Sequence, residues 1–149
     1  MPENIIVASA VIPYEEGFVY VMTESDGKWG LAGGKIDPKE DLRIGLIREV
    51  VQETNLEILI RNMLPPVHFE SGSGNTILNL PFVGEVIQGT PSVIRPKEIR
   101  EVSVLNIGEI RSLYRGGKIR SGYANLGPVE DYLLGNLLAP DTVRCFLQR

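Results

Sequence analysis

The spacing of apolar and polar residues predicts three extended segments in the first quarter of the chain. Residues 4–14 are mainly β-branched or otherwise apolar, and their proline argues against a helix. A Glu-Glu-Gly turn separates them from residues 18–23, which we expect to be their hairpin partner. Residues 29–31 predict a short extended piece that leads into a Gly-Gly turn, where the permissive glycine backbone can approach a ligand closely.

The next segment, residues 41–54, predicts the main helix of the molecule. Its apolar residues recur at helical spacing, so we expect them to pack against a sheet. Gly45, in the middle of the segment, would cost about 1 kcal/mol relative to alanine, which indicates close packing at that point. The residues expected on the buried face are Ile44, Ile47, Val50 and Val51.

The second half of the chain returns to strand patterns and then closes with helices. Pro81 marks a candidate interruption of the longest strand pattern. The order of elements predicts an α+β fold, with an α/β/α sandwich around a mixed β-sheet. Strands are expected at residues 56–63, 67–70, 76–87 and 98–105, and helices at residues 107–114 and 128–138.

Composition adds limits on partners and location. The 149 residues are 43% apolar and 23% charged, as in ordinary soluble proteins, and predict a single domain over residues 1–149. A net charge of −4 argues against duplex nucleic acid as a partner, because its binders present a basic surface. Cys145 is the only cysteine, so no intramolecular disulfide can form, and a cytoplasmic location is expected. No apolar run reaches the length of a membrane span, so no membrane partner is expected.

Three polar side chains gather on one face of the predicted helix. At about 100° per helical residue, Gln52 and Glu53 fall within roughly 60° of Glu49. Two carboxylates and an amide oxygen suit a hard divalent cation such as Mg2+, whose remaining ligands are often substrate phosphates. For this spacing alone, a solvated acidic surface is the alternative.

The wider spacing around this face resembles the Nudix box, G-x5-E-x7-R-E-U-x-E-E-x-G-U, in which U is aliphatic. Two positions depart from that pattern. Gln52 replaces the first Glu of the Glu-Glu pair, and Asn55 replaces the last glycine, a change that the left-handed end of a helix tolerates. Gln52 keeps an oxygen but loses a charge, which weakens or redistributes metal binding. The matching positions are Gly34, Glu40, Arg48, Glu49, Val50, Glu53 and Leu56.

The resemblance implies the Nudix fold and a pyrophosphohydrolase that uses Mg2+ or Mn2+. The implied substrate is a small nucleotide, a nucleoside diphosphate linked to another moiety. The expected metal ligands are Glu49 and Glu53, with Gln52 as a weak neutral ligand and the backbone carbonyl of Gly34 as a further one.

The box also implies roles beyond metal binding. Gly33, Gly34 and Arg48 are the expected substrate-binding residues. Glu40 and Arg48 are expected to form an ion pair that orients the box and takes no direct part in the chemistry.

The expected catalytic residues are Glu49, Glu53 and Glu98. In proteins with the Nudix box, a carboxylate just before the last core strand often supplies the general base, and Glu98 fits that place best. Glu49 is an equal candidate for the base, and Glu101 is the reserve for Glu98. A surface glutamate in a charged segment is the alternative for both Glu98 and Glu101.

Two other functions stay open at this stage. A catalytically weak or inactive nucleotide-binding or regulatory protein on the same fold is supported by Gln52. An isomerase on this fold would require cysteine and histidine in the pocket, and Cys145 and His68 lie outside the box. No residue pattern identifies the substrate further, and a homodimer is implied only by its frequency on this fold.

Two remaining features bear on ligand binding. The Gly-rich basic segment of residues 115–125 is expected to be a solvated loop, with contact to a phosphate as the alternative. Four aromatic residues can either flank a base or line the core, and we expect the core for most of them: Phe18, Tyr20, Phe69 and Phe82.

Overall fold

The computed structural model describes residues 2–147. The strands are β1 (Asn4–Val11), β2 (Pro13–Tyr14), β3 (Gly17–Thr23), β4 (Trp29–Lys35), β5 (Leu56–Met63), β6 (Val67–Glu70), β7 (Thr76–Gly89) and β8 (Ile99–Leu105). The helices are α1 (Leu42–Thr54), α2 (Ile107–Arg115), the 3-10 turn η1 (Gly122–Asn125) and α3 (Gly127–Leu134).

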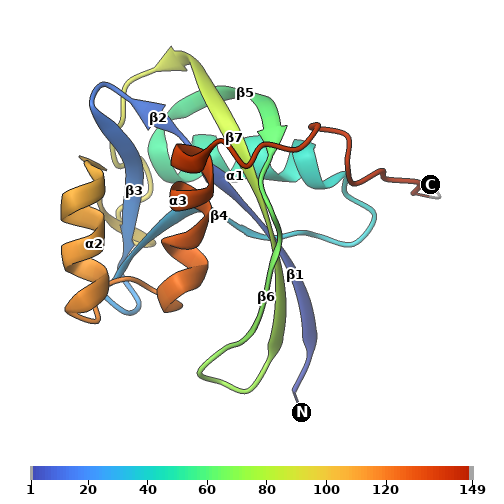
Figure 1. Ribbon diagram of the computed structural model, residues 1–149, viewed down its shortest axis with the longest axis horizontal. Coiled ribbons are helices and arrows are strands. Elements are labelled where there is room, and N and C mark those ends of the chain that lie inside the picture. The colour runs from blue at the N-terminus through green and yellow to red at the C-terminus, as the bar shows by residue number, and fades with distance from the viewer. Residues whose placement is uncertain (1, 148–149) are drawn as a thin grey trace.

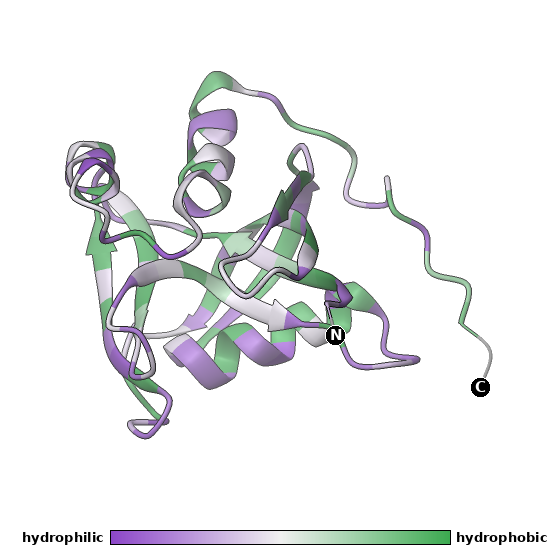
Figure 2. Cartoon of the chain, turned by 90° about the horizontal axis from the view of Figure 1, so that it is seen from below, coloured by the Kyte–Doolittle hydropathy of each residue, from purple (hydrophilic) through white to green (hydrophobic). Residues whose placement is uncertain are grey.

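A mixed sheet forms the middle layer of the molecule. Its strand order is β2-β3-β4-β1-β7-β5, with β6 beside β7 and β8 beside β3. β1 and β7 run parallel, and the other named pairs run antiparallel. α1 covers one face, and α2 and α3 lie on the other (Figures 1 and 2). This arrangement confirms the predicted α+β sandwich.

The sheet separates two apolar cores because successive side chains of a strand point to opposite faces. Along β3, Val19 and Val21 pack in the core beneath α1. Phe18 and Tyr20 pack in the core beneath α2 and α3, and that core also contains Ile110 of α2. α1 therefore buries its apolar residues against one side of these strands, and α2 and α3 bury theirs against the other.

The hairpin predicted between the first two strands is wrong for most of its length. β3 pairs with the short β2, where Pro13 lies opposite Phe18. It does not pair with β1, because β4 lies between the two strands and hydrogen-bonds to both. The local turn was visible in the sequence, but the insertion of β4 depends on long-range pairing.

The Gly-Gly pair lies within β4 and does not form the predicted turn. Gly33 pairs with Ser9 of β1 and has a positive φ of 146°, a conformation that favours glycine. A Cβ atom at Gly33 would collide with the carbonyl oxygen of Ala8. Glycine is required here because the two backbones approach each other too closely for a side chain.

The main helix forms as predicted, but its buried face is rotated. Leu42, Leu46 and Val50 are buried and lie four residues apart, so they form one stripe along the helix. Ile44 is 62% exposed and Val51 is 37% exposed, contrary to expectation. Ile44 follows Leu42 by two residues, or about 200° of helical rotation, and therefore points away from the sheet.

Gly45 shows the close packing predicted for it. A Cβ atom there would lie 2.6 Å from Glu40 Oε1, so a larger residue would displace the carboxylate. The helix ends at Asn55, whose φ of 64° is left-handed, as expected from its place in the box.

Two predicted boundaries in the second half are wrong. β7 is continuous through Pro81, which lies opposite Ser9 and accepts a hydrogen bond of 2.8 Å from the backbone N–H of Leu64. α3 ends at Leu134 and does not reach residue 138, because Gly135 adopts a left-handed φ of 76°. Within residues 2–147, no helix is long and apolar enough to cross a bilayer.

Candidate active site

The loop before α1 positions the start of the box. Asp41 caps the helix: its carboxylate accepts a hydrogen bond of 2.9 Å from the backbone N–H of Arg43 and one of 3.4 Å from that of Ile44. These bonds satisfy N–H groups that have no partner within the helix. The loop therefore continues to Asp41, and the helix starts at Leu42.

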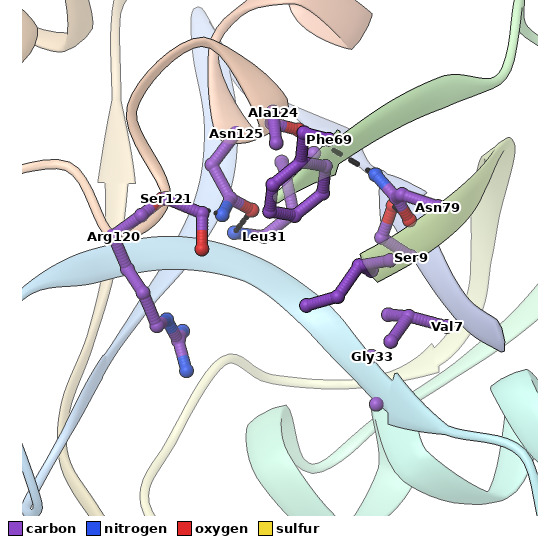
Figure 3. Close-up of a pocket in the computed structure, with 12 residues that line it drawn as sticks. Val7, Ser9, Leu31, Gly33, Phe69, Asn79, Arg120, Ser121, Ala124 and Asn125 are labelled. Carbon is purple, nitrogen blue, oxygen red and sulfur yellow. Dashed lines mark hydrogen bonds between the residues drawn. The ribbon is translucent and has the colours of Figure 1, made fainter. Parts of the chain in front are cut away.

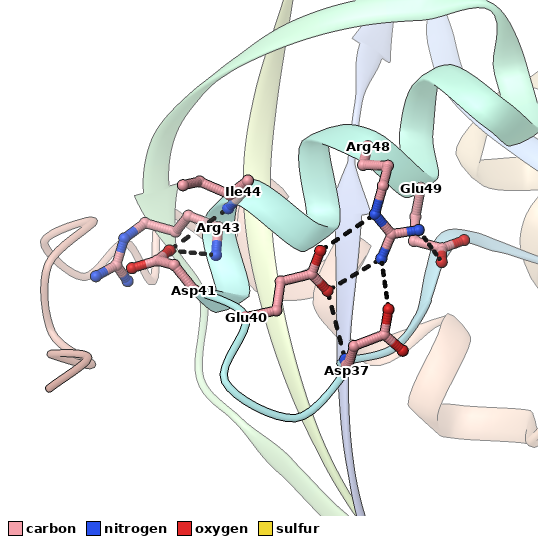
Figure 4. A network of polar contacts seen from close by, with 7 residues as sticks. All are labelled: Asp37, Glu40, Asp41, Arg43, Ile44, Arg48 and Glu49. Atoms are coloured by element: carbon pink, nitrogen blue, oxygen red, sulfur yellow. Dashed lines mark hydrogen bonds and ion pairs between the residues drawn. The ribbon is translucent and has the colours of Figure 1, made fainter. Parts of the chain in front are cut away.

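Arg48 lies at the centre of an ion-pair network (Figure 4). Its guanidinium donates to both carboxylate oxygens of Glu40, at 3.2 and 3.0 Å, and to Glu49 Oε1 at 3.1 Å. Asp37 lies 3.6 Å away. The geometry confirms the expected Glu40–Arg48 pair and shows that it also holds Glu49. The assignment of Arg48 to substrate binding stays a prediction.

Glu53 is partly buried and is anchored to β4, the strand that carries Gly33 and Gly34. The backbone N–H of Gly33 donates to Glu53 Oε1 at 2.9 Å. Burial raises the pKa of Glu53 to about 7, and the negative charges of Glu49 and Glu98 act in the same direction, while the Gly33 hydrogen bond and the charge of Arg120 oppose it. The carboxylate of Glu53 is thus partly removed from solvent, in a region where both acidic groups and Arg120 act on it.

Glu49 and Gly34 lie next to Glu53. A Cβ atom at Gly34 would lie 3.5 Å from the carboxylate of Glu49, so that strand residue and that side chain are in direct proximity. Gln52 is half-buried on α1, and nothing in the described contacts fixes its role. Its assignment as a weak ligand stays a prediction.

The donor set fits a cation that shares its ligands with a substrate. Within residues 2–147, no three Asp, Glu, His or Cys side chains form a ready-made metal cage. Mg2+ is typically held by one or two carboxylates together with substrate phosphates. Glu49 and Glu53 supply two carboxylates for that pattern, and the carbonyl of Gly34 as a further ligand stays a prediction.

The two candidate bases near β8 lie in different surroundings. Glu98 precedes the strand: its carboxylate is 62% exposed, 3.7 Å from Arg95, and its charge acts on Glu53. Glu101 lies within β8 opposite Met22, and its carboxylate accepts a hydrogen bond of 2.9 Å from Ser103. The assignment of Glu98 as the base, with Glu101 in reserve, stays a prediction.

A cavity of about 210 Å3 opens beside β4, next to Gly33 and Gly34 (Figure 3). Ser9 donates to Asn79 Oδ1 at 2.9 Å across its wall, and the backbone N–H of Leu31 donates to Asn125 Oδ1 at 2.9 Å. The cavity is lined by Val7, Ser9, Leu31, Gly33, Gly34, Phe69, Ile77, Asn79, Arg120, Ser121, Ala124 and Asn125.

The sequence prediction missed most of this lining. Phe18, Tyr20 and Phe82 are core residues, as expected, and Phe69 is the aromatic residue that lines the cavity. Ser9 and Asn79 gave a usable signal, because each is a single buried polar residue within an apolar strand.

The comparisons with known proteins agree with this geometry. The family model of the NUDIX domain matches residues 4–124. The chain therefore belongs to the NUDIX family. A search among curated proteins gave no match to the sequence.

Solved structures share the fold. A NUDIX hydrolase from Nitrosomonas europaea has a TM-score of 0.85 and 24% identity, covering 96% of this chain and 97% of that chain. The MutT protein from Methanosarcina mazei Go1 has a TM-score of 0.72 and 24% identity, covering 89% and 96%. An ADP-ribose pyrophosphatase from Streptococcus suis has a TM-score of 0.64 and 13% identity, covering 95% of both chains. At these identities the likeness establishes the fold.

Proposed function

We propose that this protein is a metal-dependent hydrolase that cleaves the diphosphate linkage of a nucleoside diphosphate joined to another moiety. The observation that carries the proposal is the environment of Glu53. Its carboxylate is partly buried, lies one helical turn from Glu49, and accepts a hydrogen bond from Gly33, which lines the cavity. Two neighbouring carboxylates beside the cavity favour a bound cation, and membership of the NUDIX family supports the general chemistry.

The chain's own residues provide the ligands and hold them in place. Glu49 and Glu53 would hold Mg2+ or Mn2+, with the carbonyl of Gly34 and the amide oxygen of Gln52 as neutral donors. The chemistry that this cation supplies when bound is Lewis acidity, which neutralises charge on the phosphoryl oxygens and activates the attacking water. The backbone N–H of Gly33 holds Oε1 of Glu53, which leaves Oε2 to bind the cation.

Glu98 is the proposed general base, with Glu49 as the alternative. Arg48 already contacts one oxygen of Glu49. Glu98 is exposed and lies 3.7 Å from Arg95, so its carboxylate has room for a water molecule. It would accept the proton of that water as the water attacks phosphorus.

The cavity would receive the base or the other moiety of a small nucleotide. Phe69 provides an aromatic surface, and Leu31 and Ile77 provide apolar walls that exclude water. A single domain over residues 1–149, a cytoplasmic location, the absence of duplex nucleic acid as a partner, and a homodimer all stay predictions.

The test is product release from nucleoside triphosphates, ADP-ribose, nucleotide sugars and dinucleoside polyphosphates, with Mg2+ or Mn2+. Glu53→Gln serves as the inactive variant. Glu57→Gln, an exposed glutamate on β5, is the matched control. We expect release by the wild type and Glu57→Gln, and none by Glu53→Gln. Equal release by all three proteins would overturn the proposal.

The rival function is nucleotide binding without cleavage, and Gln52 is the observation that favours it. No product release from any nucleotide, together with a rise in melting temperature caused by one of the same nucleotides, would favour this rival.

A further inference from the structure

Arg120 projects from a fixed point of the backbone into the candidate site. Its N–H donates to the carbonyl of Trp29 at 2.7 Å, and its own carbonyl accepts a hydrogen bond of 2.6 Å from Asn125 Nδ2. The preceding residue, Ile119, is only 4% exposed and bridges to Trp29 of β4. This part of the Gly-rich segment is therefore not the solvated loop that its composition suggested.

The guanidinium lies flat against β4 because Gly30 has no side chain. A Cβ atom at Gly30 would collide with Arg120 Nη2. Arg120 lines the same cavity as Gly33 and Gly34, and its side chain crosses the strand that carries them (Figure 3). The absence of a side chain at Gly30 thus leaves space for the Arg120 guanidinium beside the cavity.

In the described part of the chain, Arg120 is one of several arginines without a carboxylate partner, and unlike the exposed Arg115 it lines the cavity. Arg61, Arg100 and Arg111 contact glutamates at 2.6, 3.1 and 3.2 Å. Within residues 2–147, the guanidinium of Arg120 forms neither an ion pair nor a hydrogen bond to another side chain. Its charge still acts on Glu53, so the cation and the carboxylate cluster share one region.

A diphosphate has anionic oxygens for both groups. With a divalent cation on the carboxylates, a diphosphate still has anionic oxygens that need a second positive partner. The planar guanidinium matches phosphate oxygens in a bidentate geometry and is the preferred side chain for this contact.

We propose that Arg120 binds a phosphate group of the substrate from the wall of the cavity that it lines. The inference rests on the proposed function only in assuming that the ligand carries a diphosphate. Asn125 is the positioning residue, because its side-chain amide holds the Arg120 carbonyl and its oxygen accepts from Leu31 of β4.

The test is the binding of inorganic pyrophosphate, with Mg2+, measured by isothermal titration calorimetry. Arg120→Ala should raise the Kd about 10- to 100-fold, the effect expected for a charged hydrogen-bonding group. Arg120→Lys keeps the positive charge but loses the two parallel N–H donors of the guanidinium. Its Kd should lie between those of the wild type and Arg120→Ala. Arg115→Ala removes an exposed arginine at the end of α2 and should match the wild type. Arg120→Gln, of similar size, replaces the alanine variant if that variant fails to fold.

The outcomes separate this inference from the hydrolase proposal. Equal Kd values for the wild type and the Arg120 variants would overturn the role of Arg120 and leave the hydrolase proposal standing. Arg120-dependent binding without hydrolysis of any nucleotide would support Arg120 and overturn the hydrolase. A wild-type protein that does not bind pyrophosphate would overturn the inference.

Discussion

Two glutamates of the box, Glu40 and Glu53, lie in opposite electrostatic environments. The hydrogen bonds of the Arg48 guanidinium hold the pKa of Glu40 below its usual range. Burial, with further acidic groups nearby, raises the pKa of Glu53 to about 7. The Glu40 carboxylate is paired with the Arg48 guanidinium. The Glu53 carboxylate lies where its negative charge is unfavourable.

We propose that this difference separates a supporting ion pair from a metal-binding carboxylate within one motif. The Glu40–Arg48 pair is satisfied internally and fixes the position of Glu49. Among the described contacts, the Glu53 carboxylate accepts one hydrogen bond, from Gly33. Carboxylates with strongly raised pKa values occur most often at functional sites. The predictions below test whether the two glutamates differ in this way.

The largest expected effect is on turnover by Glu53→Gln. Because the change removes a proposed metal ligand, we expect a loss of more than about 100-fold, since residues that merely support metal ligands cost about 10- to 100-fold. The initial rate on the best substrate of the panel measures it, with Glu57→Gln as control. A loss below tenfold would exclude Glu53 from the site.

The next effect is on stability without metal. The folded pKa of Glu53 lies above its unfolded value of about 4.3, so the folded state holds its proton more tightly. Wild-type stability should therefore fall, relative to Glu53→Gln, as pH rises from about 4 to about 7, by an amount on the order of 2–3 kcal/mol. Urea unfolding of both proteins at several pH values measures this difference, and parallel profiles would contradict the account.

Gly33→Ala tests the strand that anchors Glu53. The positive φ and the collision with Ala8 should destabilise the fold by about 1–3 kcal/mol and reduce activity through displacement of the N–H donor. Gly72→Ala is the matched control, because a Cβ atom there meets no neighbour within 4 Å. We expect it to change the unfolding free energy by less than about 0.5 kcal/mol. Similar effects of both changes would contradict the proposed strand geometry.

The smallest effect is that of Glu40→Gln on stability. The pair with Arg48 is partly exposed and should contribute less than about 1 kcal/mol. Because the folded pKa of Glu40 is lowered, this contribution is present above the unfolded pKa and disappears as pH falls through the folded one. The pH dependence is thus opposite in sign to that of Glu53. An unfolding difference that persists at acid pH would point to another cause.

The sequence was most informative where the structure is local. The left-handed Asn55, the close packing at Gly45 and the Glu40–Arg48 pair lie within one loop and helix, so the local sequence was sufficient to predict them. The cap at Asp41 was not predicted. The order of strands and helices was likewise sufficient for the α+β sandwich.

The sequence was least informative where segments distant in the chain meet. The insertion of β4 between β1 and β3 and the contact of Ser9 with Asn79 depend on pairings that no local pattern encodes. Arg120 shows the same limit, because its environment depends on Trp29, Gly30 and Asn125. The rotated face of α1 has a different cause: apolar residues occur on more than one side of that helix.

The central claim is that Glu53 and Glu49 together bind a divalent cation, and titration of the protein with Mg2+ by isothermal calorimetry tests it most directly. We predict binding to the wild type, loss of binding in Glu53→Gln, and tighter binding in Gln52→Glu, which adds a charge to the same face. Glu57→Gln should match the wild type. Equal Mg2+ affinity in the wild type and Glu53→Gln would contradict the account.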